Sequence, residues 1–357
     1  MQGIDTLTDT KIRNGEITVE VLADQDRAAW DRFVDAHPGA TVYHTSWWRD
    51  TVVSSFGHRS YPLIARGPSG EILGVLPLFY VRGLLSGRLV SSPLRDRGGA
   101  LGDPGARRAL AGAARRLAEE LGCRYVLLKQ GESSPELTDN RYVRIDHWVT
   151  MLLDLPARWE RLNPKVRWSV RKGEHSGLLF EMSTTVEAGE RFYRLFRETR
   201  RRLGVPTYAC RFFRSLAGQP AVRFCFASQN GADVAGIVLL LHGRRAVSGY
   251  AANSNAGRAF RANEFAYWHA IRWSSENGYQ TFDFGADSPH QTGVRQFKEK
   301  WDAREVPVPH YYFLNRARRV PLRDSSNGVL RLLRKPWSWL PDPLFEIASH
   351  WAVRHVD

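Results

Sequence analysis

The sequence has few cysteines and no long hydrophobic segment. Its three cysteines in 357 residues, Cys123, Cys210 and Cys225, are odd in number and widely spaced. This pattern excludes a disulfide framework, and because the histidines show no metal-ligand spacing either, we predict no metal. The longest apolar run, Val234 to Leu241, is too short to span a bilayer, and the N-terminal residues lack the features of a secretion signal. Together these absences predict a cytoplasmic protein.

Positive charge, in contrast, is abundant. Lysine and arginine number 51 against 37 aspartates and glutamates, which leaves a formal charge of +14. This balance favours polyanionic partners such as RNA, phosphorylated ligands or an anionic membrane face, whereas a basic composition without a binding role is the alternative. The densest basic run, Lys165, Arg167, Arg171 and Lys172, falls within two helical turns.

The C-terminal segment is both basic and aromatic, notably from Arg331 to Trp339. It could bind peripherally to the inner face of the membrane or pack on the rest of the protein. Three prolines, Pro336, Pro341 and Pro343, prevent one long amphipathic helix, so we favour packing.

The two halves of the chain repeat one outline. A polar turn leads into an apolar strand, Gly74 to Tyr80 in the first half and Gly236 to Leu241 in the second. A helix end and another strand follow in each half, with Gly122 and Gly278 where a helix needs a left-handed cap. Two unrelated α/β domains are the alternative to this repeat.

These elements predict an α/β (α+β) fold of two tandem domains that share a cleft, each a mixed, mostly antiparallel sheet flanked by helices. We expect a helix over residues 106–121 in the first half and one with Asn263 as its N-cap in the second. The predicted parts are a first domain at 1–155, a basic connecting helix at 156–177, a second domain at 178–315 and a tail at 316–357 that packs back on the body.

Two stretches together carry a resemblance to a known family. The first contains Tyr43-His-Thr-Ser-Trp47-Trp48, Phe56-Gly57 and Arg97-Gly98-Gly99-Ala100; the second contains Asp283-Phe-Gly285-Ala and Gly293-Val-Arg-Gln-Phe297-Lys298-Glu-Lys-Trp301. This succession resembles the Fem-like branch of the GNAT acyltransferase superfamily, and more closely the FemAB-related proteins associated with exopolysaccharide and PEP-CTERM sorting loci. The resemblance spans roughly Tyr43 to Trp301 and implies a pair of GNAT-like domains.

The resemblance places the acyl donor in the second half. The donor is an aminoacyl-tRNA in the peptidoglycan-bridge enzymes of this branch and an acyl-CoA in ordinary GNAT enzymes. Family members carry a lysine after the phenylalanine of the donor site, which corresponds to Lys298 after Phe297, and we expect Gly293 and Arg295 to contact the donor as well. The basic run from Lys165 to Lys172 is expected to face RNA.

The resemblance places the acceptor mainly in the first half. The candidates there are Trp47, Trp48, Arg97, Gly98 and Gly99. The last three also match the spacing of a GNAT pyrophosphate loop, with an ordinary turn as the alternative. The equivalent loop of the second half, 253–258, matches less well, which weakens the acyl-CoA hypothesis.

One segment departs from the family pattern. Peptidoglycan-bridge enzymes carry an arginine and a tyrosine for their acceptor where this sequence has Tyr208 and Phe212. Arg211 is the candidate that restores the charge from a neighbouring position, with an outward arginine on a packed helix as the alternative.

Acyl transfer to an amine passes through an oxyanion, and a fixed cation beside it lowers the barrier by about 3 to 4 kcal/mol. Lys298 is the predicted catalytic cation, with phosphate binding or a solvated surface position as alternatives. An ammonium acceptor must also lose a proton, and the candidate bases are Asp283, Tyr208, Asp287 and His290. Asp283 lies between two phenylalanines on a predicted strand and should face away from both, although bonding to backbone at the strand end is equally compatible.

The leading functional hypothesis is an aminoacyl-tRNA-dependent N-acyltransferase that modifies an amine on an envelope precursor, a polysaccharide or a small metabolite. Acyl-CoA-dependent transfer on the same fold is the first alternative, and a non-catalytic binder of nucleic acid or membrane surface is the second. Charged tRNA and an amine-bearing acceptor are the expected partners. We expect no tightly bound cofactor, because the acyl donor is a co-substrate.

Overall fold

A computed structural model describes residues 12–14, 16–83, 86–287, 292–321, 337 and 339–355. The chain divides into two compact units. The sequence predicted that the first domain ends at residue 155. Unit 1 comprises residues 1–148, 307–322 and 354–357, and unit 2 comprises 149–306 and 323–353. Two strands, β10 (Val143–Asp154) and β16 (Arg304–Leu314), contribute residues to both units. Among the described residues, no helix is both long enough and apolar enough to cross a membrane.

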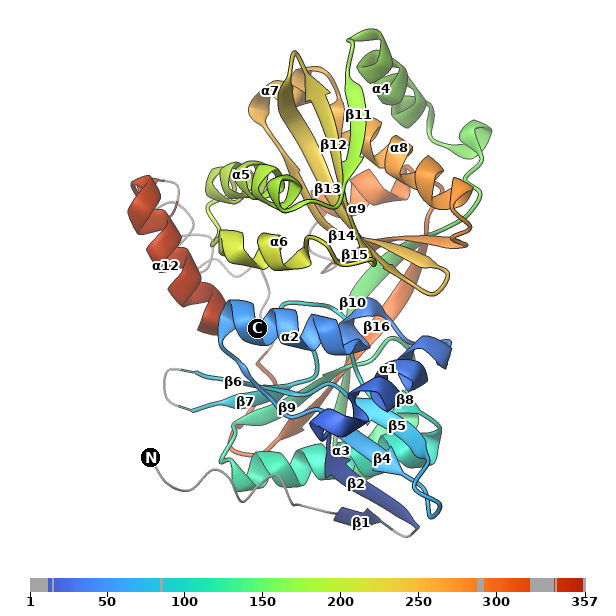
Figure 1. Cartoon of the computed structure of the whole chain (residues 1–357), viewed down its shortest axis with the longest axis vertical. Helices are drawn as coiled ribbons and strands as arrows, with labels where there is room; N and C mark the ends of the chain where they lie inside the picture. The colour runs from blue at the N-terminus through green and yellow to red at the C-terminus, as the bar shows by residue number, and fades with distance from the viewer. Residues whose placement is uncertain are drawn as a thin grey trace. The chain divides into compact units, whose positions relative to one another are not determined.

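Unit 1 contains two groups of strands (Figure 1). An antiparallel sheet has the order β1 (Ile12–Asn14), β2 (Ile17–Val21), β4 (Leu63–Arg66), β5 (Ile72–Leu76) and β8 (Leu101–Gly102). The second group has the order β3 (Arg59–Ser60), β6 (Phe79–Val81), β7 (Arg88–Val90), β9 (Tyr125–Lys129) and β16, in which β7 and β9 are parallel. The helices of this unit are α1 (Arg27–Ala36), α2 (Ser46–Phe56) and α3 (Pro104–Glu120).

Helix α3 forms the centre of the unit 1 core. Asp103 caps it by accepting a hydrogen bond from the Ala106 N–H, and Pro104 occupies the first turn, where a missing N–H costs nothing. Its alanine-rich face is buried together with apolar residues of β2, β4 and β5. Gly122 follows the helix with a φ of 62°, so the predicted helix and its left-handed cap are both confirmed.

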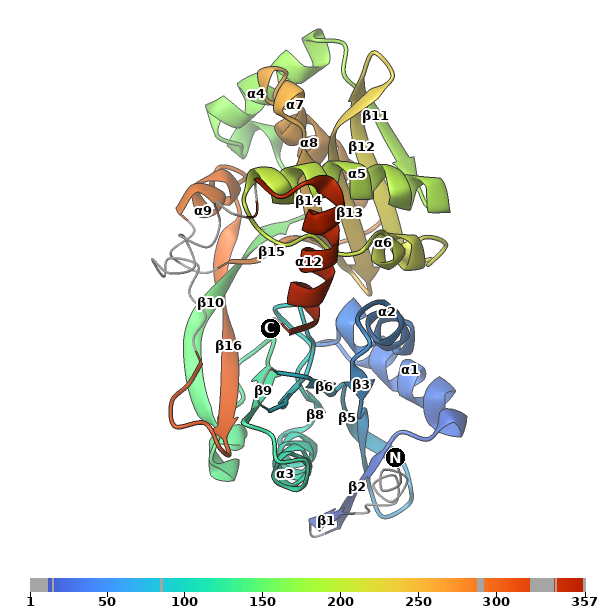
Figure 2. The same cartoon turned by 90° about the vertical axis from the view of Figure 1, so that its left-hand side faces the viewer.

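Unit 2 contains one sheet, seen from two directions in Figures 1 and 2. Its strand order is β11 (Leu179–Ser183), β12 (Val222–Gln229), β13 (Ala232–His242), β14 (Arg245–Asn253), β15 (Thr281–Asp287) and β10. Neighbouring strands are antiparallel except β14 and β15, which are parallel. The helices are α4 (Pro164–His175), α5 (Val186–Arg202), α6 (Cys210–Leu216), α7 (Asn255–Ala259), α8 (Ala262–Glu276), α9 (Thr292–Glu299) and α12 (Asp342–His355).

Alternate residues of the central strands of unit 2 face different helices. Phe224 of β12 lies against Phe192 of α5, with the two ring centroids 6.2 Å apart. Its neighbour Cys225 belongs instead to a core shared with Phe265 and Ala270 of α8. Because successive side chains of a strand point to opposite faces, α5 and α8 cover opposite faces of this sheet.

The second part of the predicted repeat, a helix end followed by a strand, is present in both units. A strand, a helix and a strand parallel to the first occur in this order as β7, α3 and β9 in unit 1, with β8 before the helix, and as β14, α8 and β15 in unit 2, with α7 before the helix. Gly278 after α8 has a φ of 81°, as a left-handed cap requires. The predicted fold of mixed, mostly antiparallel sheets flanked by helices is therefore confirmed.

Two local predictions are wrong. Helix α8 begins at Ala262, preceded by Arg261 with a φ of 60°, so Asn263 lies in its first turn and does not cap it. The apolar run from Gly74 to Tyr80 is divided into β5 and β6 around Pro77, because proline has no N–H to donate within a sheet.

Candidate functional site

The parallel strands β14 and β15 pair over only part of their length. Their register runs from Arg245–Thr281 to Val247–Asp283. Both strands continue further, but within the described ranges they form no later pairing with each other. Where two parallel strands part, their backbone N–H and C=O groups are left for other partners, which makes the parting point a candidate site.

A glycine interrupts each strand close to this point. In β14, Ser248 pairs with Leu239 and Tyr250 pairs with Val238, so Gly249 is an extra residue, a β-bulge. In β15, Gly285 has a φ of 78° and lies where the register with β10 shifts. Bulges bend a strand and redirect its side chains, and they are frequent beside active sites.

Charged side chains hold Gly285 on both sides. Its N–H donates to Asp283 Oδ1 at 2.9 Å, and its carbonyl oxygen accepts from Lys298 Nζ at 2.7 Å. Two of the three predicted catalytic residues, one on β15 and one on α9, thus converge on a single residue.

Asp283 is completely buried. Thr150 Oγ1 donates to its Oδ1 at 2.6 Å, and Arg245 Nη1 lies 3.6 Å from its Oδ2. Phe282 and Phe284, on either side of it in the strand, point into the hydrophobic core of unit 2. Both expectations for this residue are met, because Asp283 faces away from the phenylalanines and also bonds to backbone.

Lys298 is 5% exposed, so it is not a solvated surface lysine. Its Nζ lies 2.5 Å from Asp287 Oδ2, in addition to its contact with the Gly285 carbonyl. An ammonium group has three N–H donors, and these two contacts use two of them in the described part of the chain. The third can donate to a bound molecule.

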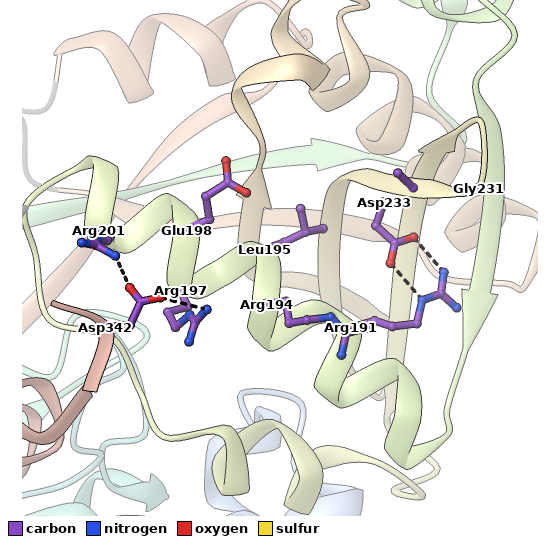
Figure 3. A pocket seen from close by; sticks show the side chains of 10 residues that line it. Arg191, Arg194, Leu195, Arg197, Glu198, Arg201, Gly231, Asp233 and Asp342 are labelled. Carbon is purple, nitrogen blue, oxygen red and sulfur yellow. Dashed lines mark hydrogen bonds and ion pairs between the residues drawn. The ribbon is translucent and has the colours of Figure 1, made fainter. Parts of the chain in front are cut away.

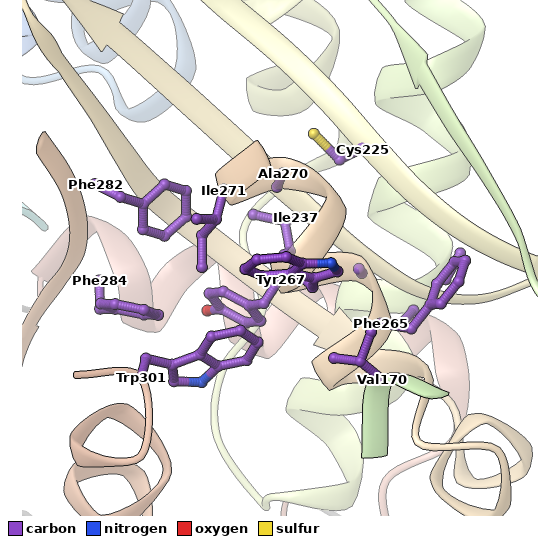
Figure 4. Close-up of a cluster of buried hydrophobic side chains, with 14 of the residues drawn as sticks. Val170, Cys225, Ile237, Phe265, Tyr267, Ala270, Ile271, Phe282, Phe284 and Trp301 are labelled. Carbon is purple, nitrogen blue, oxygen red and sulfur yellow. The ribbon is translucent and has the colours of Figure 1, made fainter. Parts of the chain in front are cut away.

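Tyr267 of α8 belongs to the same region, and sequence reasoning missed it. Its hydroxyl lies 3.0 Å from Ser248 Oγ on β14, and its ring packs 5.2 Å from that of Phe297. Figure 4 shows Tyr267 beside Phe284 in the buried core. Burial raises the pKa of Tyr267 to about 12; the nearby Asp287 carboxylate also raises it, and the Ser248 hydrogen bond lowers it.

This raised pKa predicts a stability loss at alkaline pH. An unfolded tyrosine loses its proton near pH 10, whereas folded Tyr267 keeps its proton to about pH 12. Its contribution is complete below pH 10 and is lost as the pH rises through 12, at about 1.4 kcal/mol for each pH unit. In urea denaturation, the wild-type free energy of unfolding should therefore fall more steeply over this range than that of Tyr267→Phe. Equal slopes for the two proteins would contradict the assignment.

The other donor candidates on α9 differ in their surroundings. Phe297 packs against Tyr267 and the fully buried Trp301. Gly293 is exposed, with nothing within 4 Å of an added Cβ. Arg295 is ion-paired with Glu299 at 3.0 Å and with Glu305 at 2.5 Å. His290 lies outside the described residues, as does the basic segment 331–336.

The basic run of the connecting segment lies on α4, within predicted helix 156–177. Lys165 and Arg171 are exposed and Arg167 and Lys172 are partly exposed. None of the four forms an ion pair with another described residue.

The acceptor candidates of unit 1 lie in packed surroundings. Trp48 is 1% exposed and contacts the partly buried Trp47 edge to face. Arg97 is buried, 3.3 Å from an Asp96 carboxylate oxygen. Gly98 has a φ of 128°, and a Cβ there would lie 2.6 Å from Ser92 Cβ. At Gly99 a Cβ would lie 2.9 Å from the Lys129 carbonyl oxygen and still closer to the side-chain amide of Gln130. Packing therefore requires both glycines, and their role at an acceptor stays a prediction.

Tyr208 and Arg211 lie together in unit 2. Tyr208 is buried among aromatic rings, 5.4 Å from Phe212 and 5.8 Å from Tyr250 of β14. Arg211 is exposed on α6. Their catalytic and acceptor-binding roles stay predictions.

A pocket of about 570 Å³ lies beside α5 (Figure 3). Most of its arginines are paired: Arg191 with Asp233, and Arg197 and Arg201 with Asp342 of α12. None of the predicted site residues lines this pocket.

Three comparisons with known proteins bear on this geometry. Residues 162–299 match the family model described as an acetyltransferase (GNAT) domain. The fold is similar to the crystal structure of FemX, with a TM-score of 0.66, 15% identity and coverage of 88% of this chain and 99% of that chain. A comparison with curated protein sequences gave no match.

Two further solved structures are similar to this chain. One is the C-terminal domain of an Agrobacterium fabrum protein assigned as a lysylphosphatidylglycerol synthetase, with a TM-score of 0.57, 15% identity and coverage of 88% of this chain and 97% of that chain. The other is a tandem GNAT protein from the clavulanic acid biosynthesis pathway, with a TM-score of 0.53, 14% identity and coverage of 84% and 98%. These similarities establish a tandem GNAT-like fold. The parting strands, Asp283 and Lys298 all lie within the matched segment 162–299.

Proposed function

We propose that this acyltransferase belongs to the Fem-like branch and transfers an aminoacyl group from a charged tRNA to an amine. The acyltransferase class rests on the match of residues 162–299 to the GNAT domain. The observation that carries the proposal is the buried Lys298, whose Nζ lies 2.7 Å from the Gly285 carbonyl oxygen where β14 and β15 part.

Lys298 suits the chemistry of an ester donor. When the acceptor amine attacks the ester carbonyl, a C–N bond forms and negative charge develops on the carbonyl oxygen. The third N–H of Lys298 donates to this oxyanion, and a cation acts more strongly in such a buried place than in water. The bond to the ribose oxygen then breaks, and the proton lost by the amine leaves with that oxygen. Asp283 keeps Gly285, and with it Lys298, in position.

The loop after β14 favours tRNA over acyl-CoA as the donor. A GNAT pyrophosphate loop offers backbone N–H groups to the anion, but here the Gly257 N–H donates to Ser254 Oγ at 3.1 Å. The loop also packs closely on β13, because a Cβ on Gly257 would lie 2.4 Å from the Val234 carbonyl oxygen. The charge of +14 supports a polyanionic donor as well.

The structural neighbours offer support of two kinds. The name lysylphosphatidylglycerol synthetase describes the joining of a lysyl group to a lipid, which supports transfer of an aminoacyl group, though to a different class of acceptor, as a reaction of this fold. The tandem GNAT protein of the clavulanic acid pathway is described as a form without AcCoA, which keeps an acyl-CoA donor as the second candidate for this chain.

An assay with both donors tests the proposal. Labelled aminoacyl-tRNA and, separately, acetyl-CoA are incubated with the protein and a panel of amines that includes envelope precursors, amino sugars and small metabolites. We expect product from aminoacyl-tRNA only, and we expect RNase to abolish it. Product formed from acetyl-CoA in the presence of RNase would establish the second candidate instead. Absence of product with both donors would favour a non-catalytic binder.

A further inference from the structure

Helix α4 exposes a large aromatic side chain to solvent. Trp168 is 54% exposed, although the helix has a well-formed buried face made by Val166, Val170 and Gly173. That face packs against Phe265 of α8, which lies 2.9 Å from the position of a Cβ on Gly173. The exposed ring of Trp168 therefore makes no contribution to this core.

Cations occupy the rest of the exposed side of α4 between residues 164 and 172, ahead of the exposed Glu174 in the last turn. With 3.6 residues per turn, Lys165, Trp168 and Lys172 lie along one side, and Arg167 and Arg171 lie along the next. No aspartate or glutamate occurs between residues 164 and 172. Outside its core contact, this part of α4 thus carries four cations and one tryptophan, and Arg171 has its guanidinium carbon 5.8 Å from the centroid of the Trp159 ring.

A fifth cation comes from another element. Arg261, at the junction of α7 and α8, has its guanidinium carbon 5.4 Å from the centroid of the Trp168 ring, and Lys172 Nζ is also 5.4 Å from it. Like the four cations of α4, Arg261 forms no ion pair with any other residue that the structure describes. Cation–π contacts at this distance hold the ring in place without neutralising the cations.

We propose that this surface, the α4 face (Lys165, Arg167, Trp168, Arg171, Lys172 and Arg261), binds RNA at an unpaired nucleotide. Trp168 stacks on the base, and the surrounding cations contact the adjacent phosphates. This inference rests on the proposed function, since a charged tRNA carries its aminoacyl ester at an unpaired 3′ end. A membrane-binding helix would instead expose a continuous apolar stripe, whereas the apolar residues of α4 other than Trp168 are buried against α8.

Binding of uncharged total tRNA to the full-length protein, measured at several salt concentrations, tests the α4 face. We expect Trp168→Ala to lower the affinity about tenfold without changing its salt dependence, because stacking releases no counterions. The difference should disappear with tRNA trimmed of its unpaired 3′ nucleotides. Trp168→Phe should retain part of the affinity.

Substitution of the cations should change the salt dependence of tRNA binding, which substitution of Trp168 should not. Lys165→Gln combined with Lys172→Gln is expected to reduce the slope of log affinity against log salt by about two, one for each phosphate contact. Trp351→Ala on α12 and Arg108→Gln on α3 are the controls, because both side chains are exposed on other elements. We expect wild-type binding from both.

Three outcomes separate this inference from the proposed function. Wild-type tRNA affinity of Trp168→Ala, with transfer still sensitive to RNase, overturns the α4 face and leaves the proposed function standing. If the protein transfers from acetyl-CoA in the presence of RNase but still binds tRNA through Trp168, the proposed function is overturned and the α4 face stands. Vesicles of phosphatidylglycerol that bind through Trp168 in preference to tRNA would assign the face to a membrane and overturn the inference.

Discussion

Replacement of Lys298 by methionine is expected to lower kcat by about 10²- to 10³-fold in the aminoacyl transfer assay. Methionine keeps the length and apolar stem of the side chain but removes the only ammonium that contacts the Gly285 carbonyl among the described residues. The loss corresponds to about 3 to 4 kcal/mol of oxyanion stabilisation. Lys300→Ala is the control, two residues further along. Among the described residues, Lys300 makes no side-chain contact with Gly285, so this variant should leave kcat unchanged.

A structural role for Lys298 must be separated from a chemical one. Lys298→Met removes the ammonium that lies 2.5 Å from the Asp287 carboxylate, and breaking this largely buried ion pair should cost about 3 kcal/mol of stability. Adding Asp287→Asn removes that carboxylate charge, so the double variant should recover most of the free energy of unfolding but not the turnover. If the double variant regained activity together with stability, Lys298 would serve only to neutralise Asp287.

The sequence identified the charged residues of this site but not the residue they share. Lys298 and Asp283 were found from a family pattern and from strand alternation, whereas Gly285 was named only as part of the family motif, without a role of its own. Its importance depends on a positive φ and on the shift in register with β10, and neither follows from the alternation of apolar and polar residues. For the same reason, the bulge at Gly249 could not be predicted.

Tyr267 was missed for a different reason. Its spacing on α8 is that of a core residue, and most of its ring does lie in the core of unit 2. Only the tertiary contact of its hydroxyl with Ser248, which is 19 residues away, distinguishes it from an ordinary buried aromatic residue. Periodicity indicates that a side chain is buried but not which polar group meets it there.

For the glycines of unit 1, the sequence suggested a ligand-binding role at positions where packing alone requires glycine. The spacing of Arg97, Gly98 and Gly99 is compatible with a loop that approaches an anion. In the structure, Gly98 fits against Ser92 and Gly99 against Gln130, with no room for a Cβ at either position. Sequence spacing alone cannot distinguish a glycine that packing requires from one that a ligand requires.

Substitution of Asp283 is expected to lower both stability and activity. Comparison of two variants shows whether the residue positions Gly285 or transfers a proton. Asp283→Ala removes an acceptor from the Gly285 N–H and the Thr150 hydroxyl in a fully buried place, so we expect a loss of about 3 kcal/mol in the free energy of unfolding. Because Gly285 is then no longer held, Lys298 loses its orientation. The value of kcat/KM should fall about 100-fold.

Asp283→Asn is the discriminating variant because its amide oxygen can still accept from the Gly285 N–H, whereas an amide cannot accept the proton of an amine. A carboxylate surrounded by Thr150, Gly285 and Arg245 has little room for a substrate proton, so we assign it a positioning role. The asparagine variant should therefore keep kcat/KM within about tenfold of the wild type, with an unchanged dependence on pH. A loss as large as that of Asp283→Ala, together with disappearance of a limb of the pH profile, would make Asp283 the general base.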